Sequence, residues 1–206
     1  MSAQLNLILI DTLLKAYGAP RLSELIRKLA LLDREVRVRI ELGENDASRV
    51  MRDVLESFSK LSGGKIVVEA AEAAGGGEYP PPHIILVTGF EGRLRYHGLI
   101  DGILLCPLLE SILYAGGGLE AKAPETGEHR AVLYVVPGRP CLVTLRNLIP
   151  VVAANNGVEL DVVDAREYER MGGKLPSPYV PALVVDGRLV KVGSVKSVEE
   201  AAELLE

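Results

Sequence analysis

The hydrophobic and polar positions of this chain predict strands and helices in a repeated order. Short apolar or alternating runs predict strands, at Val36–Leu42, Lys65–Glu69, Ala131–Val136 and Val158–Asp164. Between the first and second of these strands, and again between the third and fourth, apolar residues at helical spacing predict an amphipathic helix. The apolar faces are formed by Val50, Val54, Leu55, Phe58 and Leu61 in the first helix and by Leu145, Leu148, Ile149 and Val152 in the second. A further helix is predicted at Leu22–Leu32, so the chain has a helical lead before its first strand.

An internal repeat extends this order. The segment EGRLRYHG (Glu91–Gly98) recurs 95 residues later as DGRLVKVG (Asp186–Gly193). In each copy an acidic residue and a glycine precede alternating residues, a pattern that predicts a tight β-hairpin. A proline, Pro82 or Pro181, opens the apolar strand before each hairpin, and a helical pattern follows it. Each half therefore reads β-α-β, a variable link, then β-β-α.

The repeat predicts an α/β fold built from two tandem units. The Gly- and charge-rich stretch 115–129 separates the copies, so we predict an N-terminal domain at 1–118, which includes the helical lead, and a C-terminal domain at 119–206. The opening β-α-β of each unit is expected to be parallel. The link differs between the halves: AREYERMGG in the second has room for a short helix, whereas AAEAAGGGEYPP in the first reads as a loop.

Composition narrows the functional classes. The 206 residues carry a net charge of −5, which offers no basic surface for nucleic acid. The start, MSAQLNLILIDTLL, lacks a basic region and contains Asp11, so it predicts neither a signal peptide nor a membrane span, and we expect a cytoplasmic protein. A single glutamine, with abundant Glu, Arg and Val, favours a thermophilic source.

Two cysteines, Cys106 and Cys141, are the only thiols. They are too few for a disulfide framework and show no metal-ligand spacing with the histidines, so we expect no metal and no cofactor. His97 takes the place that Val192 has in the repeat, which favours a partly buried sheet position. Cys106 falls in an apolar helical stretch, where a thiol is expected to be buried.

The order of these elements resembles the thioredoxin fold. The tandem arrangement, the helical lead, RYHGLIDG after the first hairpin, and VVPGRPC and YVPALVVDG in the second half are similar to the archaeal protein disulfide oxidoreductases, a glutaredoxin-like family. The resemblance implies Cys-x-x-Cys at the N-terminus of the first helix of each unit. There the helix dipole and free amide groups lower the pKa of a thiol, and a second cysteine releases the mixed disulfide.

Neither unit of this chain has that motif. In the first half the equivalent turn reads LGENDASRVM, without a cysteine, and Asn45 and Asp46 are interpreted as helix-capping residues. In the second half two registers are open. Pro140 can match the proline of Cys-Pro-x-Cys, which puts Arg139 at the nucleophile position, or Cys141 can be the resolving cysteine, which puts Gly138 there. Neither register supports a dithiol cycle.

The prolines carry a second part of the implied site. Pro181 matches the cis-proline that faces the active-site turn in thioredoxin-like proteins, where the adjoining backbone, here at Val180, would bind an extended peptide or glutathione. Pro82 is the equivalent residue in the first half. Prolines that only open strands are the alternative interpretation.

Two functions therefore stay open. The first is an oxidoreductase-like protein with degenerate sites that binds peptides or proteins and has little or no dithiol exchange activity. The second is a monothiol, glutaredoxin-like enzyme in which Cys141 is catalytic, Arg139 lowers its pKa and Pro181 holds the substrate. The expected partners are protein or peptide thiols and disulfides or glutathione, with neither nucleic acid nor membrane, and the protein is expected to be a monomer or a homodimer.

Overall fold

The helices and strands follow the hydrophobic pattern. The computed structural model describes residues 11, 13–15 and 18–206. The strands are β1 (Val36–Leu42), β2 (Ile66–Glu72), β3 (His83–Leu86), β4 (Leu94–His97), β5 (His129–Val135), β6 (Val158–Asp164), β7 (Ala182–Val185) and β8 (Arg188–Val192). The helices are α2 (Ala19–Ala30), α3 (Asp46–Leu61), α4 (Leu105–Ala115) after the 3-10 turn η1 (Gly102–Leu104), α5 (Arg139–Ala154), α6 (Ala165–Arg170) and α7 (Val198–Glu203).

The strands form one sheet in the order β2-β1-β3-β4-β6-β5-β7-β8. In the first half β1 pairs in parallel with β2 and antiparallel with β3; in the second half β5 pairs in the same way with β6 and β7. The predicted α/β fold of two tandem β-α-β and β-β-α units is therefore confirmed. The helical lead is present as α2, and the second link contains α6, whereas the first link, 73–82, has no helix.

The two halves share the sheet because β4 pairs in parallel with β6. The backbone from Leu94 to His97 runs beside that from Leu160 to Val163. The sequence pattern contained no sign of this pairing, since it joins elements of different repeats. The domain boundary between 118 and 119 stays a prediction.

The Arg93 side chain also connects the halves. It extends from the first hairpin, is only 9% exposed, and its Nη1 atom donates to the carbonyl oxygens of Val152, Asn155 and Val158 at 2.8, 2.9 and 3.1 Å. These carbonyls lie where α5 ends and β6 begins. Because carbonyls at a helix C-terminus lack partners within the helix, the guanidinium satisfies them and joins the first half to the second.

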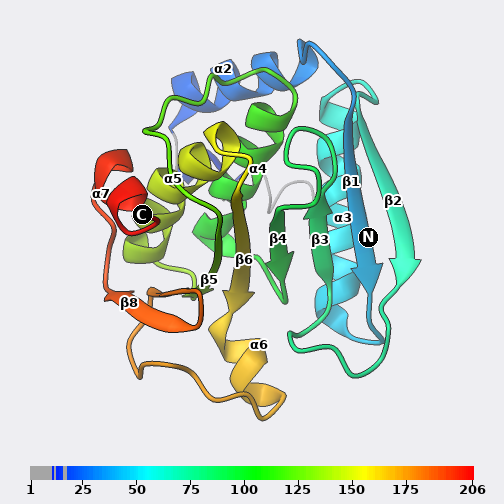
Figure 1. Ribbon diagram of the computed structural model, residues 1–206. Coiled ribbons are helices and arrows are strands. Elements are labelled where there is room, and N and C mark those ends of the chain that lie inside the picture. Colours follow the sequence, from blue (N-terminus) through cyan, green and yellow to red (C-terminus); the bar gives the residue numbers. More distant parts are fainter. Residues whose placement is uncertain (1–10, 12, 16–17) are drawn as a thin grey trace.

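Helices cover the two faces of the sheet unequally (Figure 1). Helices α3, α4, α5 and α7 lie on one face, over a core that includes the fully buried Phe58 and Tyr96, while the short α6 lies on the other. Alternation along β4 puts Tyr96 into the core and turns Arg95 and His97 to the opposite face. Polar side chains of neighbouring strands therefore meet on the face with less helical cover.

The two hairpins differ. In the second, Val185 pairs with Arg188 across the two-residue turn Asp186–Gly187, whose φ angles of 48° and 77° are those of the predicted tight turn. In the first, Leu86 pairs with Leu94, so the connection is longer than predicted. The predicted acidic-glycine turn is nevertheless present, because Glu91 and Gly92 have φ angles of 49° and 80° and the Arg93 N–H donates to the Phe90 carbonyl oxygen at 2.8 Å. It lies within the longer connection, where Phe90, 0% exposed, packs into the core.

Within the described residues, no helix combines the length and hydrophobicity needed to cross a membrane. The apolar start of the chain, residues 1–10, lies outside the described residues. The cytoplasmic location stays a prediction.

Candidate functional site

Helix α5 begins at the segment that resembles an active-site turn. Gly138 is its N-cap residue, with extended backbone, and Arg139 and Pro140 are exposed in the first turn. Proline suits this position because its fixed φ is helical and a first-turn amide needs no partner within the helix. Cys141 follows on the first turn, but its side chain points inward and is 1% exposed.

The surroundings of Cys141 do not favour a thiolate. Burial is the larger influence and raises the pKa of the thiol, while a backbone hydrogen bond at Val136 lowers it; the net direction is upward. Cys106, on α4, is 0% exposed, and both cysteines are free thiols. Both thiols of the chain are therefore shielded from solvent.

The Pro181 segment lies at the same end of the strands as the start of α5. The Val180–Pro181 bond is cis, and Ala182 pairs with Tyr134, so Pro181 lies across from the last residue of β5. Pro181 is buried and Val180 is half-buried, whereas the Tyr179 side chain is 72% exposed. The fold thus brings together the two segments of the second half that the sequence singled out.

Apolar side chains are exposed beside this segment. The backbone N–H of Gly193 donates to the carbonyl oxygen of Pro181 at 2.8 Å, which holds the end of β8 against it. Leu189, Val190 and Val192 of β8, the outermost strand, are 44%, 38% and 42% exposed. We call Tyr179 with these three residues the Tyr179 surface.

The first half has an equivalent arrangement without a thiol. Asn45 is the N-cap of α3: its Oδ1 atom accepts from the backbone N–H of Ser48 at 2.8 Å, and its Nδ2 atom donates to the carbonyl oxygen of Pro81 at 3.1 Å. The Pro81–Pro82 bond is cis. Asn45 therefore caps the helix and also fixes the loop before Pro82. Asp46 is exposed and pairs with Arg49, one turn along the helix.

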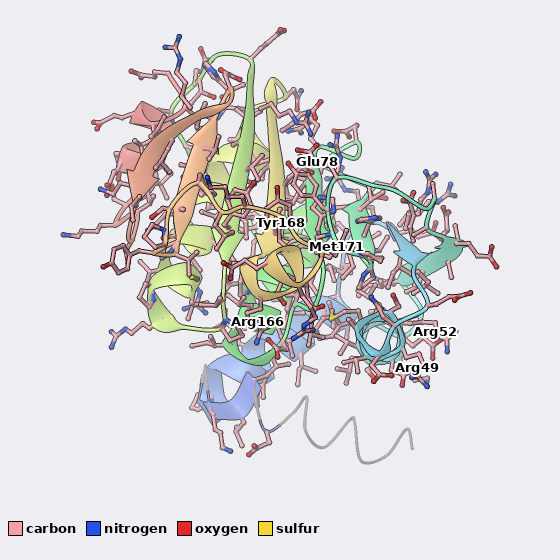
Figure 2. The ribbon with its side chains drawn as sticks, turned by 90° about the horizontal axis from the view of Figure 1, so that it is seen from below. Arg49, Arg52, Glu78, Arg166, Tyr168 and Met171 are labelled. Carbon is pink, nitrogen blue, oxygen red and sulfur yellow. The ribbon has the colours of Figure 1, made fainter. Side chains whose placement is uncertain are left out.

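A polar hollow of about 630 Å³ lies between the start of α3 and α6. Figure 2 shows Arg49 of α3 and Arg166 of α6 from below, and both line the hollow. The Arg166 guanidinium lies 2.9 Å from Asp164 and 3.0 Å from Asp101, and these contacts raise the pKa of Arg166. Asn45 and Asp46 also line the hollow, so its surface combines paired charges of both signs.

A hydrogen-bonded series of three titratable side chains, His83, His97 and Asp161, crosses from the first half to the second. The Nδ1 atoms of His83 and His97 are 2.8 Å apart, and the Nε2 atom of His97 is 2.8 Å from the Oδ1 atom of Asp161. The spacing of the histidines gave no signal for this group, because β4 and β6 come from different repeats. Among the described residues no group of His, Cys, Asp or Glu is arranged to hold a metal ion.

Asp161 is the buried carboxylate at the end of this hydrogen-bonded series. It is 1% exposed; burial raises the pKa of its carboxyl, but the His97 hydrogen bond and the charges of Arg95 and Arg130 outweigh burial and lower it. The Oδ2 atom has no hydrogen bond with suitable geometry, although Arg130 Nη2 lies 3.5 Å away and contributes its charge. Burial and the neighbouring His97 lower the pKa of His83.

Comparison with known proteins identifies the fold. A family model described as a thioredoxin domain matches residues 135–206. The structure of alkylhydroperoxide reductase AhpF from Enterococcus faecalis has 19% identity and a TM-score of 0.75 over 89% of this chain and 96% of that one. A protein disulfide oxidoreductase from Aeropyrum pernix has 17% identity and a TM-score of 0.66 over 88% and 91%. No curated protein matched. The fold is therefore thioredoxin-like.

Proposed function

We propose that this protein is oxidoreductase-like in fold but binds peptides or unfolded protein segments without dithiol exchange. Protein disulfide oxidoreductase and AhpF structures share the fold, and a fold shared at this identity does not assign their activity to this chain. The proposal rests on the thiols. A chain with two cysteines that are 35 positions apart has no Cys-x-x-Cys.

The burial of Cys141 carries the proposal. A thiol must reach the sulfur of its substrate as a thiolate. The Cys141 side chain is 1% exposed and burial raises its pKa, so neither accessibility nor ionisation favours attack. Cys106 is buried within α4 and supplies no substitute.

The binding part of the proposed site is the Tyr179 surface with Val180 and Pro181. An outermost strand has one edge whose backbone groups can pair with an extended peptide, and exposed apolar side chains can cover alternate residues of that peptide. The exposed Arg139 and Pro140 at the start of α5 extend this surface. The substrate-binding roles of these residues are part of the proposal.

Monothiol exchange through Cys141 is the second candidate. One observation favours it: the backbone hydrogen bond at Val136 lowers the thiol pKa. Burial opposes this effect and is larger, so the first candidate has the stronger support.

The test pairs binding with turnover. A fluorescent peptide with blocked cysteines and alternating apolar residues is titrated by anisotropy into the wild type, Tyr179→Ser and Leu31→Ser. Leu31 is 66% exposed after α2 and serves as the control. We expect Tyr179→Ser to weaken binding about tenfold and Leu31→Ser to leave it unchanged. Turnover of a disulfide substrate by the wild type above that of a Cys141→Ala variant would overturn the proposal.

A further inference from the structure

The hydrogen bonds of Asp161, His97 and His83 link the position of one ring hydrogen to the next. The Asp161 carboxylate accepts, so the Nε2 atom of His97 carries the hydrogen between them. In neutral His97 the Nδ1 atom is then bare and accepts from the Nδ1 atom of His83. Neutral His83 consequently has a bare Nε2 atom. With both histidines neutral, the outer nitrogen of His83 is therefore an acceptor.

That nitrogen lies at a pocket of about 590 Å³, and His83 is one of the lining residues. A Cβ atom placed on Gly77, also in the lining, would be 3.8 Å from His83 Nε2. The volume is within the range of about 300–1,000 Å³ that ligand pockets usually have. The pocket is therefore large enough for more than a bound water or ion, and a histidine ring nitrogen faces it.

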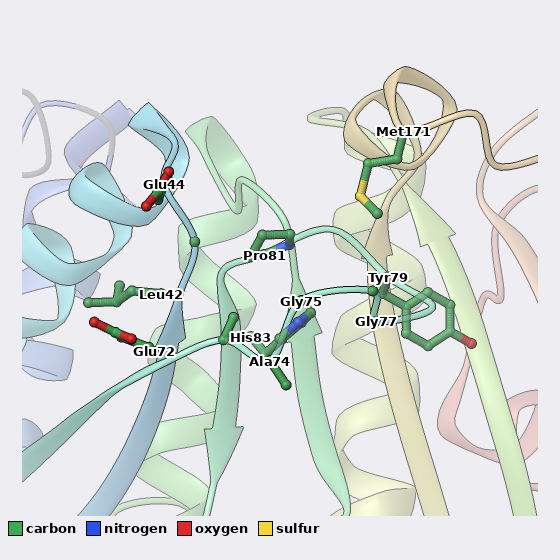
Figure 3. Close-up of a pocket in the computed structure, with 13 residues that line it drawn as sticks. Leu42, Glu44, Glu72, Ala74, Gly75, Gly77, Tyr79, Pro81, His83 and Met171 are labelled. Carbon is green, nitrogen blue, oxygen red and sulfur yellow. The ribbon is translucent and has the colours of Figure 1, made fainter.

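The charge of the pocket is negative. Glu44 and Glu72 line it, and none of the described residues that line it is Lys or Arg. Within the described part of the chain, neither carboxylate takes part in an ion pair. In Figure 3 the two carboxylates lie on one side of the pocket, His83 in the middle, and Tyr79 and Met171 on the other side.

We propose that this pocket binds the arginine or lysine side chain of a peptide, whose N–H groups donate to His83 Nε2 and to the carboxylates of Glu44 and Glu72. A cationic donor matches one bare ring nitrogen and two carboxylates, whereas an anion would meet three acceptors. The Met171 side chain, 53% exposed, offers an apolar contact to a neighbouring residue of the peptide. A metal ion is the poorer occupant, because the described His and acidic residues are not grouped for coordination.

The site is separate from the Tyr179 surface. It lies beside the start of α3 in the first half, with Met171 reaching it from the segment after α6. The proposal does not depend on the function proposed for the second half. A Tyr179→Ser variant is expected to retain the preference of this pocket for a positively charged side chain.

The test uses two peptides that differ in one charge: acetyl-Ala-Leu-Arg-Leu-Ala-amide and the same peptide with citrulline, an uncharged isostere, in place of arginine. Both are titrated by calorimetry at pH 7.5. We expect the arginine peptide to bind the wild type about tenfold more tightly, since the charge strengthens the hydrogen bonds to the pocket. The double variant Glu44→Gln/Glu72→Gln is expected to bind both peptides equally.

A matched control keeps the same change of net charge. Glu56→Gln/Glu69→Gln removes two exposed carboxylates of α3 and β2 that do not line the pocket, and it is expected to keep the tenfold preference. The nitrogen-15 spectrum of the wild type should show a bare His83 Nε2 whose resonance moves with the arginine peptide. Equal affinity for the two peptides, no binding at about 1 mM, or a preference that survives in Glu44→Gln/Glu72→Gln would overturn the proposal.

Discussion

The Nε2 atom of His97 lies 2.8 Å from the Oδ1 atom of Asp161, across the line where the two halves of the sheet meet. His97 belongs to β4 of the first half and Asp161 to β6 of the second. Arg95 and Arg130 bring positive charge to the same carboxylate, at 3.5 Å each. A buried carboxylate is thus held by one strand on each side, and its loss should weaken the junction of the halves.

Replacing this carboxylate should cost more stability than replacing its exposed neighbour. Asp161→Asn leaves an acceptor for His97 but removes the negative charge between two guanidinium groups, and we expect the free energy of unfolding to fall by about 1–3 kcal/mol. Glu159→Gln is the control, because Glu159 pairs with the same Arg95 at 2.9 Å but is 44% exposed. Its expected cost is about 0–1 kcal/mol. Urea unfolding measures both, and equal costs would contradict this assignment.

The lowered pKa of His83 predicts how the free energy of unfolding changes with pH. The pKa of His83 in the folded protein lies below its ordinary value of 6.5, because burial and His97 disfavour the charged form. The unfolded chain therefore binds a proton more readily, so the free energy of unfolding should decrease as the pH falls below 6.5, down to the lower folded-state pKa. Urea midpoints between pH 5 and 8 test this. His83→Gln should reduce the slope in that range, and an unchanged slope would show that His83 does not cause it.

The cap of α3 should contribute measurably. Asn45→Ala removes the hydrogen bond to the Ser48 amide and the one to the Pro81 carbonyl, and we expect it to lower the free energy of unfolding by about 1–2 kcal/mol. Asp46→Ala, at the next position, removes an exposed charge from the first turn and should cost about 0.5 kcal/mol. Thermal unfolding of the two variants compares them. A larger loss for Asp46→Ala would contradict the capping role.

The repeat made much of the fold predictable. Local sequence patterns, such as the acidic residue and glycine at Asp186–Gly187, determine the local backbone conformation, and the positive φ angles there confirm the turn. The same turn forms at Glu91–Gly92 in the first copy, whereas the longer connection around it, in which Phe90 is buried, did not follow from the turn pattern. The β4–β6 pairing could not be inferred, since hydrophobic spacing within a strand does not identify its neighbour.

The candidate sites divide in the same way. Asn45 as a cap and Pro181 beside the start of α5 follow from short segments and are found where expected. The contact of His97 with Asp161 does not follow from them, because it joins residues 64 positions apart. The inward orientation of Cys141 was also outside the reach of sequence, since a first-turn residue can face either the core or solvent.

The most direct test of the proposed absence of thiol exchange is the rate of alkylation of Cys141 by iodoacetamide, followed by intact mass between pH 4 and 10, with Cys106→Ala to isolate the signal. We expect slow labelling in the folded state at pH 7 and rapid labelling only after unfolding in urea, because the thiol is buried and its pKa is raised. Rapid labelling of the folded protein, with a midpoint well below the ordinary thiol pKa of about 8.5, would contradict it and assign Cys141 to monothiol exchange.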